Sequence, residues 1–98
     1  MYLVREVFNC KPGKAKELVN KFKQASKFME EEGISNLRTM TDITGAYWTV
    51  VMQYEVEDIG QFMKEIRGGG KPQPEMESIM KGYMDLVDGG YREIFLIE

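Results

Sequence analysis

The sequence predicts an α+β domain whose elements follow the order β-α-β-β-α-β. Two stretches, Tyr2–Phe8 and Tyr47–Val56, are rich in residues that favour strands. Two others, Lys14–Glu32 and Pro74–Val87, carry apolar residues at helical spacing. Turns that contain glycine or proline separate these stretches. Because the chain has 98 residues, we expect a single domain spanning residues 1–98.

In the first half of the chain, the strand Tyr2–Phe8 is followed by a turn at Pro12 and Gly13. A long helix is expected from Lys14 to Glu32, and Gly33 stands where a helix stop belongs. The next stretch, Ile34–Asp42, is a less apolar strand that suits the edge of a sheet. These elements make the first β-α-β half of the predicted domain.

The second half begins with a turn at Ile43–Ala46 and the strongest strand signal, "YWTVVMQYEV". A short amphipathic helix follows at Ile59–Ile66, then a run of three glycines. A third helix is expected from Pro74 to Val87, ended by "DGG", and the strand Tyr91–Glu98 closes the chain. The result is a ferredoxin-like, four-stranded antiparallel sheet with helices on one face and a split second helical region.

The stretch "IRGGGKPQPEME" contains three glycines followed by a lysine, and glycine-rich runs of this kind can bind phosphates. The phosphate-binding motif requires Gly-Lys-Ser/Thr after a strand, whereas Lys71 is followed by Pro72 and the run follows a helix. The glycines and prolines instead end one helix and prevent it from continuing into the next. We predict that Gly68–Gln73 is among the most mobile segments and forms a lid.

Composition excludes several kinds of site. The chain has no histidine and one cysteine, Cys10, so neither a His-containing triad nor an ordinary zinc site can form. No metal and no cofactor are expected. The net charge of −3 argues against nucleic-acid binding. No apolar run is long enough for a membrane span, and the N-terminus lacks a signal-peptide pattern, so we expect a cytoplasmic protein without a membrane partner.

Apolar residues occupy both faces of the predicted sheet. On the first strand, Tyr2, Val4 and Phe8 share a face with Glu6, while Leu3 and Val7 share the other with Arg5. The predicted third strand carries Ala46, Trp48, Val50, Met52, Tyr54 and Val56 on one face, and Tyr47, Thr49, Val51, Gln53 and Glu55 on the other. Helices can cover only one face, so we expect a homodimer that packs sheet against sheet, with a monomer as the alternative.

The whole chain resembles the dimeric α/β-barrel superfamily. "YLVREVFNCKPGKAKELVNKF" is similar to its first strand, turn and helix, and "WTVVMQYEVEDIGQFM" to its third strand and second helix. "YREIFLIE" resembles the closing strand of NIPSNAP-like members. The resemblance implies two protomers that pair their sheets into a shared barrel. Members include antibiotic-biosynthesis and haem-degrading monooxygenases, and the resemblance to the monooxygenases implies a pocket between sheet and helices.

The residues that those monooxygenases use are largely different here. By register, the asparagine of haem-degrading members falls at Glu6, their tryptophan falls near Val56, and no histidine is present. The asparagine and tryptophan of quinol-type enzymes fall at Met52 and Val56. The resemblance therefore implies no haem cofactor and leaves a cofactor-independent monooxygenase as an alternative only.

Candidate site residues follow if the Trp48 face of the third strand points toward the helices. Trp48, Met52 and Tyr54 on the third strand, with Met76, Met80 and Tyr83 from the third helix, could line a pocket for an apolar or aromatic ligand. Plain core packing is the alternative interpretation. Glu6 is the weak catalytic candidate, as a general base. Alternatively, Glu6 forms a salt bridge with an arginine on a neighbouring strand or lies at the solvent-exposed end of the sheet.

Three functions remain open on the sequence alone. The first is a small dimeric protein that binds or converts a small apolar or aromatic molecule in a cleft between sheet and helices. The second is a cofactor-independent monooxygenase acting on a quinol-like substrate. The third is a structural or regulatory dimer with a filled core and no ligand.

Overall fold

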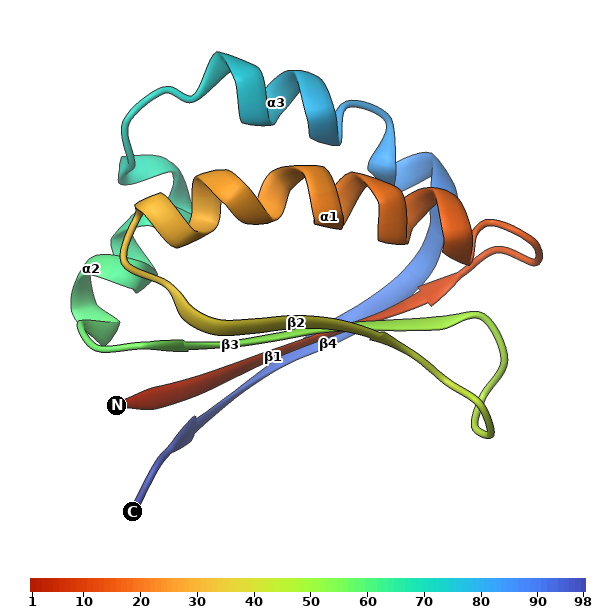
Figure 1. Ribbon diagram of the computed structural model, residues 1–98, viewed down its shortest axis with the longest axis horizontal. Helices are drawn as coiled ribbons and strands as arrows, with labels where there is room; N and C mark the ends of the chain where they lie inside the picture. Colours follow the sequence, from red (N-terminus) through yellow and green to blue (C-terminus); the bar gives the residue numbers. More distant parts are fainter.

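The computed structural model describes residues 1–98 and contains one four-stranded antiparallel sheet (Figure 1). The strands are β1 (Tyr2–Cys10), β2 (Ser35–Thr41), β3 (Thr49–Val56) and β4 (Val87–Leu96), in the spatial order β2-β3-β1-β4. The two central strands are thus the first and third in the chain, and both edges are formed by the other two. The helices lie on one side of the sheet (Figure 1). The predicted ferredoxin-like α+β fold is confirmed.

Helix α1 (Ala15–Glu31) covers the sheet with its apolar stripe, from which Leu18, Phe22 and Ala25 are buried. Its end is set by Gly33, which adopts the left-handed region with φ +87°. The Gly33 N–H donates to the Glu30 carbonyl and the Ile34 N–H to the Met29 carbonyl, which is the Schellman arrangement. The predicted helix stop at Gly33 is therefore correct.

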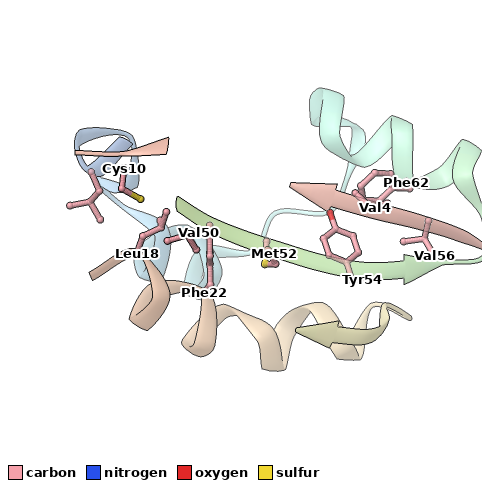
Figure 2. Close-up of a cluster of buried hydrophobic side chains, with 10 residues drawn as sticks. Val4, Cys10, Leu18, Phe22, Val50, Met52, Tyr54, Val56 and Phe62 are labelled. Atoms are coloured by element: carbon pink, nitrogen blue, oxygen red, sulfur yellow. The ribbon is translucent and has the colours of Figure 1, made fainter. Parts of the chain in front are cut away.

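The core lies between α1 and the central strands. Tyr54, Phe22, Leu18, Val4 and Val50 are its largest fully buried side chains. Figure 2 shows these and their neighbours gathered along β1, β3 and α1. The Phe8 and Phe22 rings pack 5.1 Å apart, which joins β1 directly to α1. The alternating burial of β3 confirms that Val50, Met52, Tyr54 and Val56 face the helices.

The second helical region is split, as predicted. Helix α2 (Ile59–Lys64) begins at Asp58, whose Oδ1 accepts a hydrogen bond from the Gln61 N–H. A wider turn at Glu65–Gly69 follows, and Gly68 with φ +91° breaks the helical path. Helix α3 (Pro74–Met80) then packs against α1, lying on the far side of α1 from the sheet in Figure 1.

The predicted third helix was too long. Helix α3 ends at Met80, Gly82 turns the chain with φ +81°, and a single 3₁₀ turn spans Tyr83–Leu86. Val87, expected in the helix, is the first residue of β4. The strand therefore includes Gly89 and Gly90, which were expected to end a helix.

The third strand was predicted to begin two residues too early. The strand starts at Thr49, because Tyr47 and Trp48 adopt the left-handed region with φ +58° and +55°. That conformation interrupts the alternation of side chains between the two faces. Trp48 therefore lies outside the regular alternation of β3, and it lines a cavity with the first turns of α1 rather than the core.

The other face of the sheet carries no helix (Figure 1). Directly opposed residues of antiparallel strands share a face, so Val7 is flanked there by Val51 and Tyr91. Tyr91 is 54% exposed and Phe95 is 47% exposed. Charged side chains, including the Arg5–Glu93 ion pair, lie among these apolar ones. None of the helices is both long and apolar enough to cross a membrane.

Candidate functional site

Glu6 is the centre of a polar cluster on the helix-facing side of the sheet. It lies on β1 opposite Met52 of β3 and Arg92 of β4. The Tyr54 hydroxyl donates to Glu6 Oε2 at 2.7 Å, and Arg92 Nε donates to Glu6 Oε1 at 2.8 Å. Arg92 Nη2 donates a second hydrogen bond to the same oxygen. The salt bridge with a neighbouring-strand arginine, considered from the sequence, is thus present, and whether Glu6 acts as a base stays a prediction.

Tyr54 and Arg92 are held in place by aromatic packing. The Tyr54 ring is 2% exposed and meets the Phe62 ring of α2 edge to face at 5.9 Å between centroids. The Arg92 guanidinium lies 6.0 Å from the centroid of the same Phe62 ring. One phenylalanine of α2 therefore positions both residues that hold the Glu6 carboxylate.

The pKa of the Tyr54 hydroxyl is raised well above its ordinary value of 10.0, first by burial and then by the nearby Glu6 carboxylate. Because the folded-state pKa of Tyr54 is raised, the stability that its protonated hydroxyl contributes is fully present below about pH 10. The contribution is lost as pH rises further, because deprotonation of Tyr54 is easier in the unfolded chain. Tyr54 is therefore a hydrogen-bond donor at neutral pH.

As pH rises from 9 to 11, we expect the free energy of unfolding to fall less for the Tyr54→Phe variant than for the native protein. The measurement is urea unfolding at a series of pH values, monitored by circular dichroism. Tyr47→Phe is the matched control, because Tyr47 is 82% exposed and should leave the pH dependence unchanged. Identical curves for the Tyr54→Phe variant and the native protein would contradict this assignment.

A cavity of about 510 Å³ opens beside this polar cluster. Glu6 and Tyr54 are at its sheet side, and the rest of its wall comes from the end of α1 and the residues after it, from α2, from the segment that joins α2 to α3, and from the start of α3. Its apolar lining consists of Met29, Ile34, Phe62, Ile66 and Met76. Its polar lining away from the sheet consists of Glu32, Gln61, Glu65, Lys71 and Gln73. The cavity has the size and the mixed lining of a small-molecule site.

The glycine-rich segment forms part of the wall of this cavity, through Gly69, Gly70, Lys71 and Gln73. Gln73 Nε2 donates to Glu32 Oε1 at 2.7 Å, which links the segment to the end of α1. This bond lies at the surface, so it contributes a modest net free energy of about 1 kcal/mol. The predicted lid therefore borders the cavity, and its mobility stays a prediction.

Glu6 also borders a second, smaller cavity of about 290 Å³. This cavity lies on the side of β4, and Phe8, Tyr83 and Arg92 line it. Glu6 therefore borders a cavity on two sides, although its side chain is only 12% exposed. No group of three or more acidic or cysteine side chains is placed to hold a metal ion.

The structure brings together some of the predicted site residues and separates others. Tyr54 and Met76 line the 510 Å³ cavity with Glu6. Met52 belongs to the buried core, and Met80 packs against that core. Tyr83 lines the smaller cavity, and Trp48 lines a third cavity at the other end of α1.

Sequence reasoning missed Arg92 and Phe62 as parts of this cluster. Arg92 could be found only by fixing the register of β4 against β1, which places it opposite Glu6. Phe62 was expected on the apolar stripe of the second helix, but its contacts with Tyr54 and Arg92 depend on how α2 is oriented. Neither the register of β4 nor the orientation of α2 can be predicted from the spacing of residues within one element.

Solved structures of low sequence identity share the fold of this chain. No protein-family profile matches it, and no curated protein is a significant match. An uncharacterised NIPSNAP domain protein from Burkholderia xenovorans is 13% identical, with a TM-score of 0.75 over 100% of this chain and 95% of that chain. A candidate antibiotic biosynthesis monooxygenase from Chloroflexus aurantiacus J-10-fl is 9% identical, with a TM-score of 0.76 over 99% and 92%.

The chain has the fold of NIPSNAP-like and antibiotic-biosynthesis-monooxygenase-like proteins. A conserved protein from Methanosarcina mazei Go1 is also similar, with 19% identity and a TM-score of 0.74 over 99% of this chain and 92% of that chain. The resemblance noted in the sequence is therefore confirmed for the fold. At these identities the likeness concerns the fold, so the chemistry must be argued from the residues of this chain.

Proposed function

We propose that the protein binds a small apolar or aromatic molecule that carries a hydroxyl group, in the 510 Å³ cavity. The observation that carries the proposal is a carboxylate that borders a cavity with an apolar part and is held by Tyr54 and Arg92. Both of these partners are donors, so Glu6 remains an acceptor and can receive a further hydrogen bond. A hydroxyl donor on the ligand supplies that bond, while Met29, Phe62 and Met76 contact its apolar part.

This proposal can be tested with two ligands that differ only in whether they carry a hydroxyl donor. We expect 1-naphthol to bind about tenfold or more tightly than 1-methoxynaphthalene, because a hydrogen bond to a charged group contributes about 1.5–3 kcal/mol. Isothermal titration calorimetry measures both affinities. Glu6→Gln should remove most of the difference, whereas Glu17→Gln on the exposed side of α1 should preserve it. Equal affinities for the two ligands would reject the role of Glu6.

Native mass spectrometry of protein taken directly from cells is the complementary experiment. A retained mass that disappears in a Met76→Trp variant would identify a ligand of this cavity, because the larger ring occupies the space. The same spectrum reports the oligomeric state. Retention of the same mass by the Met76→Trp variant would place the ligand elsewhere.

The second candidate function is cofactor-independent oxidation of a quinol-like substrate. The Glu6 carboxylate could accept a hydrogen bond from a quinol hydroxyl, and one structural neighbour is a candidate antibiotic biosynthesis monooxygenase. Oxygen uptake with a panel of hydroquinones tests this candidate. Uptake that is unchanged in Glu6→Gln would remove Glu6 as the base.

We further propose that two copies pair through the uncovered face of the sheet. Val7, Val51 and the exposed rings of Tyr91 and Phe95 give this face an apolar strip, which favours burial. The exposed ion pair of Arg5 and Glu93 lies on the same face of the sheet. In the dimer this pair can stay hydrated, or each residue can pair with its opposite charge on the other copy.

Replacing both Tyr91 and Phe95 by lysine is expected to convert the dimer into a monomer of 11.3 kDa. Two like-charged residues would then face their counterparts across the two-fold axis. Size-exclusion chromatography with light scattering measures the mass. Ile43→Lys is the control, because Ile43 is 97% exposed and lies in the loop between β2 and β3, outside the sheet. A monomeric native protein at micromolar concentration would contradict the proposal.

A further inference from the structure

A separate cavity of about 710 Å³ lies between the first turns of α1 and the loop that joins β2 to β3. It shares no lining residue with the two cavities that contain Glu6. Its lining includes Lys16, Val19, Asp42, Ile43, Tyr47 and Trp48. The proposed function leaves this cavity without a role.

The loop side of this cavity presents large apolar side chains to solvent. Ile43 is 97% exposed, Tyr47 is 82% exposed and Trp48 is 45% exposed. Tyr47 and Trp48 also adopt the left-handed region, which is unfavourable for residues with a side chain. Strained residues of this kind are found preferentially at ligand clamps. The aromatic pair is thus exposed and carried by a strained backbone.

Asp42 supplies a fixed negative charge beside these rings. Its N–H donates to the Thr49 carbonyl at 3.3 Å, and its Oδ1 accepts from the Thr49 N–H at 3.0 Å. These two bonds anchor Asp42 across the end of the hairpin. The second carboxylate oxygen makes no hydrogen bond within the chain.

Lys16 is the opposing charge of this cavity, but it is not anchored. Its ammonium group makes neither a hydrogen bond nor an ion pair with any other residue, and the residue is exposed. A four-carbon stem lets the ammonium move into solvent at little cost. The charge that stays fixed at the aromatic rings is therefore negative.

We propose that this cavity binds a small organic cation of the alkylated ammonium class. A tryptophan and a tyrosine together with a fixed carboxylate are the groups that recognise such cations, through the negative faces of the rings and direct charge attraction. Alkylated ammonium groups fit better than ammonium itself, because their methyl groups also bury apolar surface against Ile43 and Val19.

Trp48 is the only tryptophan of the chain, so its fluorescence reports on this cavity alone. We expect choline to change the emission saturably. Its uncharged isostere, 3,3-dimethyl-1-butanol, should bind roughly tenfold or more weakly, because it lacks the attraction to the rings and to Asp42. Equal affinity for the two probes would overturn the proposal, and so would the absence of any saturable change.

Variants separate the contributions of charge and ring. Asp42→Asn keeps an acceptor for the Thr49 N–H and should weaken choline binding about tenfold without changing the circular dichroism spectrum. Tyr47→Leu should also weaken binding, whereas Glu75→Gln on α3 is the control and should not. Lys16→Gln should leave choline binding unchanged or strengthen it. If benzoate binds instead of choline and Lys16→Gln abolishes that binding, the cavity takes anions and the proposal is wrong.

Discussion

Replacing Gly90 by alanine is expected to lower the free energy of unfolding by about 3 kcal/mol. A Cβ at this position would overlap the Val7 carbonyl oxygen and lie 3.2 Å from Phe8 Cα. Both of these atoms belong to the backbone of β1, so no side-chain rotation can relieve the contact. The β1–β4 pairing would have to shift, and with it the register that places Arg92 opposite Glu6.

The neighbouring glycine provides a matched control for this prediction. A Cβ at Gly89 would meet nothing within 4 Å, so Gly89→Ala should change stability by no more than about 0.5 kcal/mol. Urea unfolding of both variants, followed by circular dichroism, measures the difference. Equal stability of the two variants would show that the strands adjust freely around Gly90.

Removing the arginine from the Glu6 cluster is the second change with a large expected effect. Arg92→Met should lower the free energy of unfolding by about 2 kcal/mol, because it leaves a mostly buried carboxylate with Tyr54 as its one remaining partner. The value is below that for a fully buried pair, since the Arg92 side chain is 39% exposed. Chemical denaturation at neutral pH is the measurement.

Two further variants show whether the loss comes from the unpaired charge. Combining Arg92→Met with Glu6→Gln should recover about 1 kcal/mol relative to Arg92→Met alone. Arg5→Met is the control, because the Arg5–Glu93 pair is 3.5 Å apart with both side chains more than a third exposed. Its loss should cost at most about 0.5 kcal/mol. Equal losses for Arg5→Met and Arg92→Met would contradict a special role for the Glu6 cluster.

Local patterns predicted most of the fold because strands and helices impose different periods on the sequence. The alternation of β3 separated its side chains into two faces, and Gly33 marked the end of α1. Leu86 and Val87 fit the helical stripe as well as a strand, so spacing could not place the boundary between them. The glycines after Val87 suggested a stop, but Gly90 is required by its contact with β1.

The candidate site was predictable only where it depends on the face of a single strand. Alternation grouped Glu6 with Tyr2, Val4 and Phe8, and Tyr54 with Met52, and the structure places both groups on the helix-facing side and joins Glu6 to Tyr54 by a hydrogen bond. The position of Arg92 beside Glu6 depends on how β4 is aligned with β1, and these two residues are 86 positions apart in the chain. Trp48 was assigned to the wrong cavity because two residues in the left-handed region precede β3.

The way in which α3 is attached has a consequence for ligand exchange. Its main packing partner is α1, and Lys21 of α1 donates hydrogen bonds to the Ile79 and Lys81 carbonyls, at 3.1 and 2.9 Å. Helix α3 carries Met76 of the 510 Å³ cavity but has no strand pairing. Undocking of this one helix would therefore admit a ligand while the sheet stays intact. Amide hydrogens of α3 should accordingly exchange with solvent much faster than those of β1, so that ligand entry requires only local unfolding.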